Sequence, residues 1–278
     1  MRIDAHQHFW DLGRFEYTWM PPEPSVLRQT FLPDRLARIL ARNRFEGSVL
    51  IQANTLLAET HWLLDLANAN EFIRAVVGWV DLTDPLLGSV LDELQKNPKF
   101  KGVRHPVHDE ADDRWLLRAD VLAGLAEVAR RGLTYDLLLR PRHLPLVPVI
   151  AERVPDLRMA IDHIAKPFIA AQILEPWDRD MGVASQLPQV YCKLSGMITE
   201  ADPKSWTADH LRPYVSHVMR SFGPDRLMFG SDWPVCMLAG TWKEALAAFT
   251  QCIGAQPIEV REKLLGETAR RFYGIASE

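Results

Sequence analysis

Short runs of β-branched and aliphatic residues alternate with amphipathic stretches along the chain. The apolar runs have the length of buried strands and predict eight of them, at residues 2–8, 47–54, 73–82, 100–107, 134–139, 158–164, 190–196 and 226–233. The stretches between and after them carry apolar residues at helical spacing and predict helices, at Pro33–Phe45, Glu59–Glu71, Leu117–Arg131, Arg142–Arg153, Ala208–Phe222, Trp242–Ile253 and Ile258–Phe272. Strands that alternate with helices indicate βαβ units and a parallel sheet.

Eight such units favour a closed barrel over an open sheet, which usually has fewer strands. The dinucleotide-binding fingerprint GxGxxG does not follow the first strand. The sequence therefore predicts an α/β protein, a single (β/α)8 TIM-type barrel domain over residues 1–278, which is a normal length for such a barrel. The connection Phe9–Leu32 after strand one is long and aromatic. We expect it to lie on the catalytic face and to cover the substrate.

The amino-acid composition limits which classes of binding partner are expected for the protein. With 47% hydrophobic and 24% charged residues it is typical of a soluble globular protein, and a net charge of −4 favours neither nucleic acid nor an anionic membrane as partner. No signal peptide and no transmembrane run is recognisable. Three cysteines without a CxxC pair indicate reduced thiols, so we expect a cytoplasmic protein. Assembly into a homo-oligomer stays open.

Candidate chemistry lies where the predicted strands end, because barrel active sites form at the C-terminal ends of the strands. His6 and His8 lie two residues apart on strand one, so alternation places both on one face. Two converging imidazoles suit a divalent metal or a polarised substrate carbonyl. A pair of histidines hydrogen-bonded within a lid is the alternative.

Strand six ends in Asp162-His163, and alternation allows only one of these two residues to face the lumen. We expect it to be His163, with Met159 and Ile161 on the same face, because an apolar stack suits the interior of a barrel. Asp162 would then face the surrounding helices.

Strand eight ends in Gly230-Ser231-Asp232, with Gly230 and Met228 on the face of Asp232. The small residue leaves space below the carboxylate. Asp232 is also a candidate helix cap, because aspartate accepts hydrogen bonds from the free N–H groups at a helix start. Histidine, histidine and aspartate at three strand ends nevertheless favour an active site.

Further polar residues lie near the same strand ends. Strand four ends in Arg104-His105, and alternation turns one of them inward to bind a substrate oxygen. Pairing of Arg104 with a neighbouring carboxylate is the alternative. Lys166, just past strand six, either contacts the substrate or caps a loop, and Gln52 at the end of strand two is a candidate for the rim of the site.

Five motifs, in this order along the chain, resemble the amidohydrolase superfamily: DAHQHFWD at Asp4–Asp11, KGVRH at Lys101–His105, DHIAKP at Asp162–Pro167, KLSG at Lys193–Gly196 and GSDWPV at Gly230–Val235. The pattern is most similar to the sugar-lactone hydrolase branch, which includes the L-fucono-lactonase and L-rhamnono-lactonase group. The 2-pyrone-4,6-dicarboxylate lactonase is a relative of this group and uses the same barrel.

The resemblance makes Asp232 the group that activates water. It implies one set of ligands if a metal is bound: His6, His8, His163 and Asp232. Superfamily members with two metals use a bridging Lys or Glu at the end of strand four and a His at the end of strand five. Here strand four ends in Arg104-His105 and strand five holds no His. We therefore expect one divalent ion, with zinc favoured, or no catalytic metal.

The predicted reaction is hydrolysis of an aldonolactone to its aldonic acid, with Asp232 as base and with His163 and His105 as further catalytic groups. A metal, or the imidazoles together with Arg104, would stabilise the oxyanion. Flat rings suit the apolar face of a sugar, and three near strand ends are candidates for binding it: Trp10, Trp79 and Trp233. A neutral lactone is expected, because a dicarboxylate would need several cations in the site.

Three alternatives stay open. A metal-dependent decarboxylase of the same superfamily would need a metal ligand on strand five, which the sequence lacks. A 2-pyrone-4,6-dicarboxylate-type lactonase would need clamps for two carboxylates. A barrel that only binds a sugar acid would have no use for a base and its histidine partners.

Overall fold

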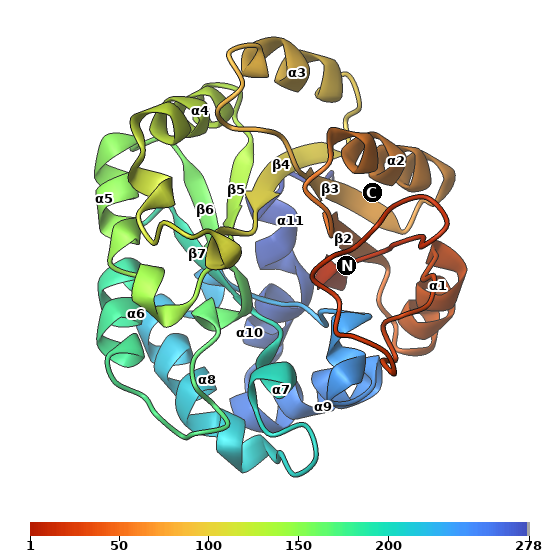
Figure 1. Cartoon of the computed structure of the whole chain (residues 1–278). Helices are drawn as coiled ribbons and strands as arrows, with labels where there is room; N and C mark the ends of the chain where they lie inside the picture. The colour runs from red at the N-terminus through yellow and green to blue at the C-terminus, as the bar shows by residue number, and fades with distance from the viewer. Residues whose placement is uncertain (277–278) are drawn as a thin grey trace.

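The computed structural model describes residues 1–276 and contains a sheet of eight parallel strands whose neighbours follow chain order. The strands are β1 (Ile3–Gln7), β2 (Gly47–Ile51), β3 (Ile73–Gly78), β4 (Phe100–His105), β5 (Thr134–Leu137), β6 (Arg158–Ile161), β7 (Val190–Leu194) and β8 (Leu227–Phe229). The α-helices surround them (Figure 1). They are α1 (Pro33–Arg42), α2 (Leu57–Ala69), α3 (Leu87–Leu94), α4 (Ala119–Arg130), α5 (Leu146–Arg153), α6 (Trp177–Ser185), α7 (Met197–Glu200), α8 (Ala208–Phe222), α9 (Trp242–Ile253), α10 (Ile258–Glu262) and α11 (Thr268–Phe272).

The first and last strands meet just beyond β8. The N–H of Asp232 donates to the carbonyl of His6 at 2.8 Å, and the N–H of His8 donates to the carbonyl of Trp233 at 2.8 Å. These bonds complete a (β/α)8 barrel and confirm the predicted fold class. The sequence pattern did not predict the helices α3, α6 and α7.

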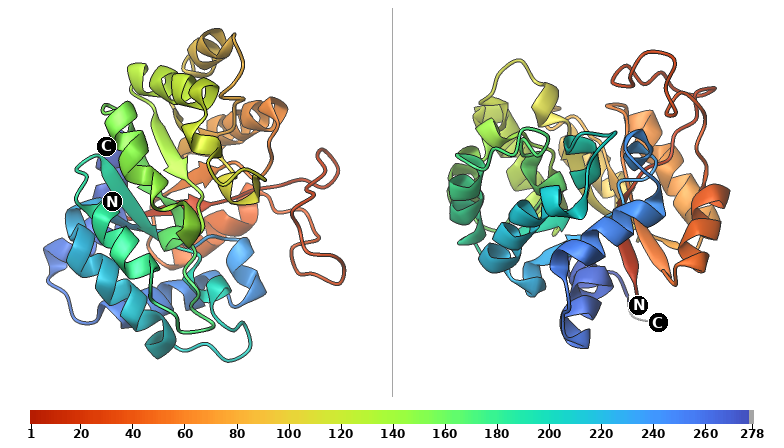
Figure 2. Two further views of the ribbon diagram at one scale, coloured as in Figure 1. Left: turned by 60° about the vertical axis from the view of Figure 1, so that its left-hand side comes forward. Right: turned by 90° about the horizontal axis from the view of Figure 1, so that it is seen from below.

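The barrel has two functionally different ends. The N-terminus and the helix α11 lie at one end, whereas the loop after β1 projects from the opposite end (Figure 2). Small and aliphatic side chains from the strands fill the lumen between them: Ile3, Ala5, Val49, Ile51, Ala75, Val77, Ala160 and Met228. Residues of α11 and the segment after it, up to Ile275, join this cluster and close the lower end of the barrel.

An irregularity in β1 sets the direction of its histidines. The pairing register with β2 shifts between Asp4 and Gln7. Asp4 faces outward, where its carboxylate accepts a hydrogen bond from the Trp242 indole N–H at 2.8 Å. Ala5 joins the lumen cluster, and His6 also turns inward, because the strand is irregular between Asp4 and Gln7.

The loop Phe9–Leu32 is packed on its own side chains, with Phe9, Trp10, Tyr17, Met20, Leu27 and Phe31 buried. Two hydrogen bonds tie it to the loop after β2. The Trp19 indole donates to the carbonyl of Ala53 at 2.7 Å, and the Asn54 amide donates to the carbonyl of Glu16 at 2.7 Å. The first two βα loops therefore form one wall.

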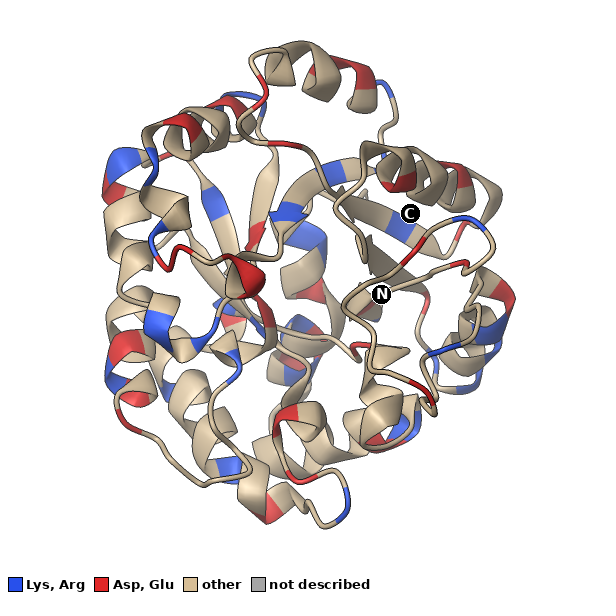
Figure 3. Cartoon of the chain, viewed as in Figure 1, with Lys and Arg blue, Asp and Glu red and all other residues tan. Residues whose placement is uncertain are grey.

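The outer helices carry charges of both signs interspersed with one another (Figure 3). Within residues 1–276, no helix has the length and apolar character that crossing a bilayer requires.

Candidate active site

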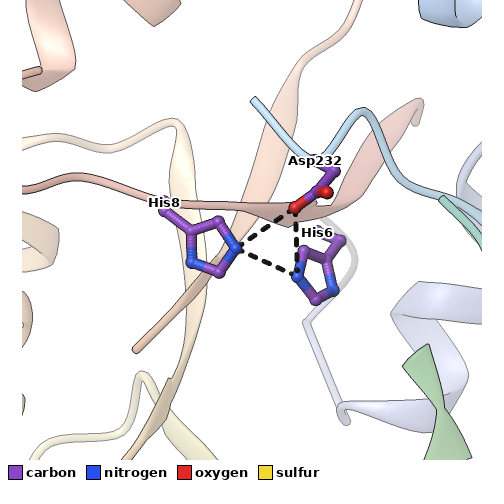
Figure 4. Close-up of side chains that lie close together, drawn as sticks. All are labelled: His6, His8 and Asp232. Carbon is purple, nitrogen blue, oxygen red and sulfur yellow. Dashed lines mark hydrogen bonds and ion pairs between the residues drawn. The ribbon is translucent and has the colours of Figure 1, made fainter. Parts of the chain in front are cut away.

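Three predicted residues converge at the upper end of the barrel (Figure 4). The Nε2 atoms of His6 and His8 are 3.1 Å apart. Oδ1 of Asp232 lies 3.3 Å from Nε2 of His8 and 3.7 Å from Nε2 of His6. All three side chains are buried, so a cation or a polarised oxygen at this point would be largely shielded from bulk water.

His8 has a defined orientation. Its Nδ1 lies 2.9 Å from the carbonyl of Ile51 at the end of β2, and a carbonyl only accepts. In the neutral ring Nδ1 therefore carries the proton, and Nε2 presents its lone pair toward His6 and Asp232. Burial holds the pKa of His6 well below its ordinary value, so the His6 ring is neutral at neutral pH.

The end of β6 corrects the prediction from alternation. His163, Ile164, Ala165 and Lys166 follow one another with positive φ angles between 47° and 59°. This left-handed turn lets both Asp162 and His163 point into the site, where the sequence pattern allowed only one. The face of the strand was also assigned wrongly. Ala160 lines the lumen, whereas Met159 and Ile161 belong to the core outside the barrel.

His163 is held by the chain after β7. Its Nδ1 lies 2.9 Å from the hydroxyl of Ser195. Gly196 has φ +63°, and a Cβ there would stand 2.6 Å from Nδ1 of His163, so only glycine suits this position. Burial keeps the pKa of His163 well below its ordinary value.

Asp232 occupies a strained position, since its φ is +57° in a region that residues with a Cβ rarely adopt. Burial by itself would raise the pKa of its carboxyl group. The nearby His163 and the hydrogen bond with His8 outweigh that effect and hold the pKa below its ordinary value. The carboxylate is therefore ionised at neutral pH, as a general base must be.

A buried ionic network lies directly below these residues. The ammonium of Lys193 from β7 is 2.5 Å from Asp136 Oδ2 and 2.9 Å from Asp162 Oδ1, and all three side chains are fully buried. Arg104 pairs with Asp162 Oδ2 at 3.1 Å, and the Tyr273 hydroxyl donates to Asp136 Oδ2 at 2.9 Å. Sequence reasoning missed Lys193 as a site residue, although a lysine inside the apolar run VYCKL is an unusual core residue and was a usable signal.

A cavity of about 630 Å³ opens above the cluster. Its polar lining includes His8, Gln52, Asn54, Arg104, His108, Asp109, Arg140, His163, Lys166 and Asp232. Its apolar lining includes Trp19, Leu138, Val235 and Leu238. The structure thus brings the predicted residues Gln52, Arg104 and Lys166 to the same cavity as Asp232.

Other predicted residues lie away from this cavity. His105 stacks on Trp115 with ring centroids 4.1 Å apart, accepts a hydrogen bond from the Trp79 indole and contacts Glu110 at 2.7 Å. Trp10 is buried inside the first loop, and Trp233 is buried against Phe9 and Phe31. None of the predicted residues His105, Trp10, Trp79 and Trp233 lines the cavity, whereas Trp19 does.

The geometry fits one metal ion. Ligand atoms at about 2.0–2.2 Å from a tetrahedral zinc lie roughly 3.3–3.6 Å from one another. The three separations within the His6–His8–Asp232 group, 3.1, 3.3 and 3.7 Å, bracket that range. A second group, His6, Asp162 and His163, shares His6 with the first. Arg104 and Lys193 stand beside His6, so cations of the chain already occupy much of the surrounding space.

Comparison with known proteins agrees with the fold and shows the family. The model of the amidohydrolase family matches residues 3–275. The L-fucono-1,5-lactonases of Burkholderia ambifaria and Burkholderia multivorans are 39% and 36% identical to this chain, each over 99% of it and 96% of their own length. A crystal structure of a Burkholderia multivorans amidohydrolase with bound zinc, 36% identical, superposes with a TM-score of 0.93 over 99% of this chain and 100% of its own. The resemblance seen in the sequence motifs is thereby confirmed, and the chain belongs to the amidohydrolase family.

Proposed function

We propose that this protein hydrolyses a sugar aldonolactone, such as L-fuconolactone, to its aldonic acid. The observation that carries the proposal is the Asp232 carboxylate, whose pKa lies below its ordinary value, between His8 and His163 at the floor of the cavity. The names and nearly full-length similarity of the two L-fucono-1,5-lactonases support it. The buried, unpaired state of the three cysteines is in keeping with the cytoplasmic location expected from the sequence.

Asp232 is the proposed base. A water molecule bound at the cavity floor would lose a proton to the Asp232 carboxylate as it attacks the lactone carbonyl. The bond between the carbonyl carbon and the ring oxygen then breaks. The protonated Asp232 returns its proton to the departing alkoxide, so the group is ready for the next cycle.

The carbonyl oxygen becomes negative during attack and needs donors aimed at it. We propose His163 and Lys166 for this task. Ser195 holds the His163 ring at Nδ1, and donation from its hydroxyl leaves Nε2 of His163 as an N–H donor. Lys166 spends one donor on Glu200 at 2.8 Å and retains others for the substrate. A divalent ion held by His6, His8 and Asp232, which we propose to be a single zinc if present, would polarise the same carbonyl.

Arg104 acts indirectly in this scheme. Its guanidinium already donates four hydrogen bonds within the protein, to Gln52 and Asp162, and it also lies 3.3 Å from Nε2 of His6. We propose that it fixes Gln52 and Asp162 and adds positive potential below the carbonyl. For His105, which lies outside the cavity, we propose a supporting role for the wall that contains Trp79 and Trp115.

The test of the proposal is acid release from a panel of L- and D-aldonolactones, followed with a pH indicator with and without chelator. We expect turnover of at least one neutral lactone. Absence of acid release from every lactone, both with zinc added and with chelator, would contradict the proposed function.

The substrate is expected to be neutral, because the cavity has few free cations. Arg104 is paired with Asp162 and Lys166 with Glu200, whereas Arg140 has no acidic partner within 4.0 Å in residues 1–276. One free guanidinium can match one carboxylate, and a second buried carboxylate would stay unpaired at a cost of several kcal/mol. We expect kcat/KM for L-fuconolactone to exceed that for 2-pyrone-4,6-dicarboxylate by about 100-fold or more. A preference for the dicarboxylate would contradict this expectation, because it would show that the cavity has more cationic groups free to bind carboxylates than Arg140 alone.

Trp19 is expected to contact the substrate, because it is the tryptophan of the first loop that lines the cavity. Trp19→Ala removes that ring and its bond to Ala53, and should raise KM by roughly 3- to 10-fold while kcat changes little, the loss typical of one aromatic contact. Val26→Ala is the matched control, since Val26 is similarly exposed in the same loop but does not line the cavity. Equal KM values for the two variants would remove Trp19 from the binding site.

A further inference from the structure

Each ring nitrogen of His6 lies close to one hydrogen-bond donor and one hydrogen-bond acceptor. Nδ1 lies 3.2 Å from the ammonium of Lys193 and 3.3 Å from Oδ1 of Asp162. Nε2 lies 3.3 Å from the Arg104 guanidinium and 3.1 Å from Nε2 of His8, which presents a lone pair. A neutral imidazole has one N–H and one lone pair, so it can satisfy only half of these neighbours at a time.

One tautomer suits Lys193. An ammonium has three donors and no acceptor, and Asp136, Asp162 and His6 are the three groups around this fully buried one. If Nδ1 of His6 accepts from Lys193, the ring proton must sit on Nε2. That N–H then points at the lone pair of His8 and at the Asp232 carboxylate, and it occupies the point where a metal would bind.

The other tautomer suits Asp162. Its Oδ1 is buried next to Lys193 but receives no well-directed hydrogen bond. An N–H at Nδ1 of His6 would provide one across the 3.3 Å separation. The lone pair of Nε2 then faces the lone pair of His8 and Asp232, and two lone pairs and a carboxylate converging on one point form a metal site.

We propose that Lys193 and Asp162 are positioning residues that select between these two tautomers of His6 and thereby set the affinity of the site for zinc. Lys193 favours the tautomer with the proton on Nε2, in which the chain's own hydrogen bonds fill the centre. Asp162 favours the tautomer that leaves Nε2 open to a metal. The inference needs the proposed ligand set but not the lactone assignment, because neither readout below involves substrate.

The first experiment uses the unaltered protein. ¹⁵N NMR of the histidine-labelled, metal-free chain at neutral pH should show His6 with its proton on Nε2. Addition of one equivalent of zinc chloride should move the proton to Nδ1. A proton on Nδ1 already in the metal-free protein would overturn the proposal.

The second experiment removes the competing donor. Lys193→Met should shift His6 to the Nδ1–H form without metal, and should tighten zinc binding by roughly 10-fold or more, the size of effect typical of groups behind a metal ligand. Tyr273→Phe is the matched control, because it alters the same buried network at Asp136 without touching His6. It should change neither the tautomer nor the dissociation constant for zinc.

Competition with a chromophoric chelator gives the zinc affinities. Equal affinities of the unaltered chain and Lys193→Met, or absence of zinc binding by both, would overturn the proposed link. If Lys193→Met does not fold, the NMR result on the unaltered chain decides. A chain inactive on every lactone would leave both results interpretable, so failure of this inference and failure of the proposed function are distinguishable.

Discussion

Asp232→Asn is expected to fold like the unaltered chain and to lose about 10²- to 10⁴-fold in kcat, the contribution of a general base. The amide keeps the shape of the carboxylate, and asparagine tolerates the positive φ of this position better than most residues. Basicity is lost, because an amide cannot take a proton from water. The measurement is kcat on the best neutral lactone, with circular dichroism and thermal unfolding to verify the fold.

Asp109→Asn is the matched control for this change. Asp109 lines the same cavity and contacts His108 at 3.2 Å, but it lies away from the histidine cluster. Its replacement should alter kcat by less than about threefold, well below the range expected for a general base. An Asp232→Asn variant that keeps more than a third of the normal rate would exclude Asp232 as the base.

Gly230→Ala is the second change with a large expected effect. A Cβ at this position would stand 2.6 Å from Cβ of His6, a distance that real Cβ atoms essentially never show, and 3.0 Å from Cβ of Ser195, which is tighter than most real Cβ contacts. The chain must therefore shift at the histidine of β1, at the serine that holds His163, or at both. We expect kcat/KM to fall by about 10²-fold, because displacements near 1 Å in an active site have such effects. Stability should fall by about 1–3 kcal/mol, as for other overpacked core positions.

Gly182→Ala provides the comparison for glycine replacement in general. Gly182 lies inside α6, and nothing stands within 4 Å of a Cβ built there. This variant should keep full activity and gain up to about 1 kcal/mol of stability, because alanine favours a helix. Full activity of Gly230→Ala would mean that His6 and Ser195 can move apart to admit a Cβ without any loss of catalysis, contrary to the packing described.

The sequence was sufficient to predict the barrel fold and to place the candidate site at the C-terminal ends of the strands. Strand order and closure follow from periodicity, and the convergence of His6, His8 and Asp232 follows from the rule that barrel chemistry lies at the strand ends. It was insufficient where the backbone leaves regular geometry. The register shift in β1 and the left-handed turn after β6 redirect side chains, and period-two reasoning assumes that neither exists.

The sequence also did not predict which charged side chains from different strands form ion pairs with one another. Lys193, Asp136 and Asp162 come from β7, β5 and the end of β6, and their pairing depends on the shear of the closed barrel rather than on any local spacing. The tryptophans show a related limit. Aromatic residues near strand ends are common in cores, and only the packed loop distinguishes Trp19 at the cavity from Trp10 inside the wall.

The contacts between the first strand of the barrel and the chain after the last strand also affect how the protein folds during its synthesis. Asp4 accepts a hydrogen bond from the N–H of Ser231, 227 positions later in the chain, and Tyr273 supports Asp136 from the lower end. Residues up to Tyr273 must therefore have emerged from the ribosome before these contacts of the site can form. Nascent chains that end before β8 expose the open edge of β1, and such edges are sites of aggregation and chaperone binding during translation.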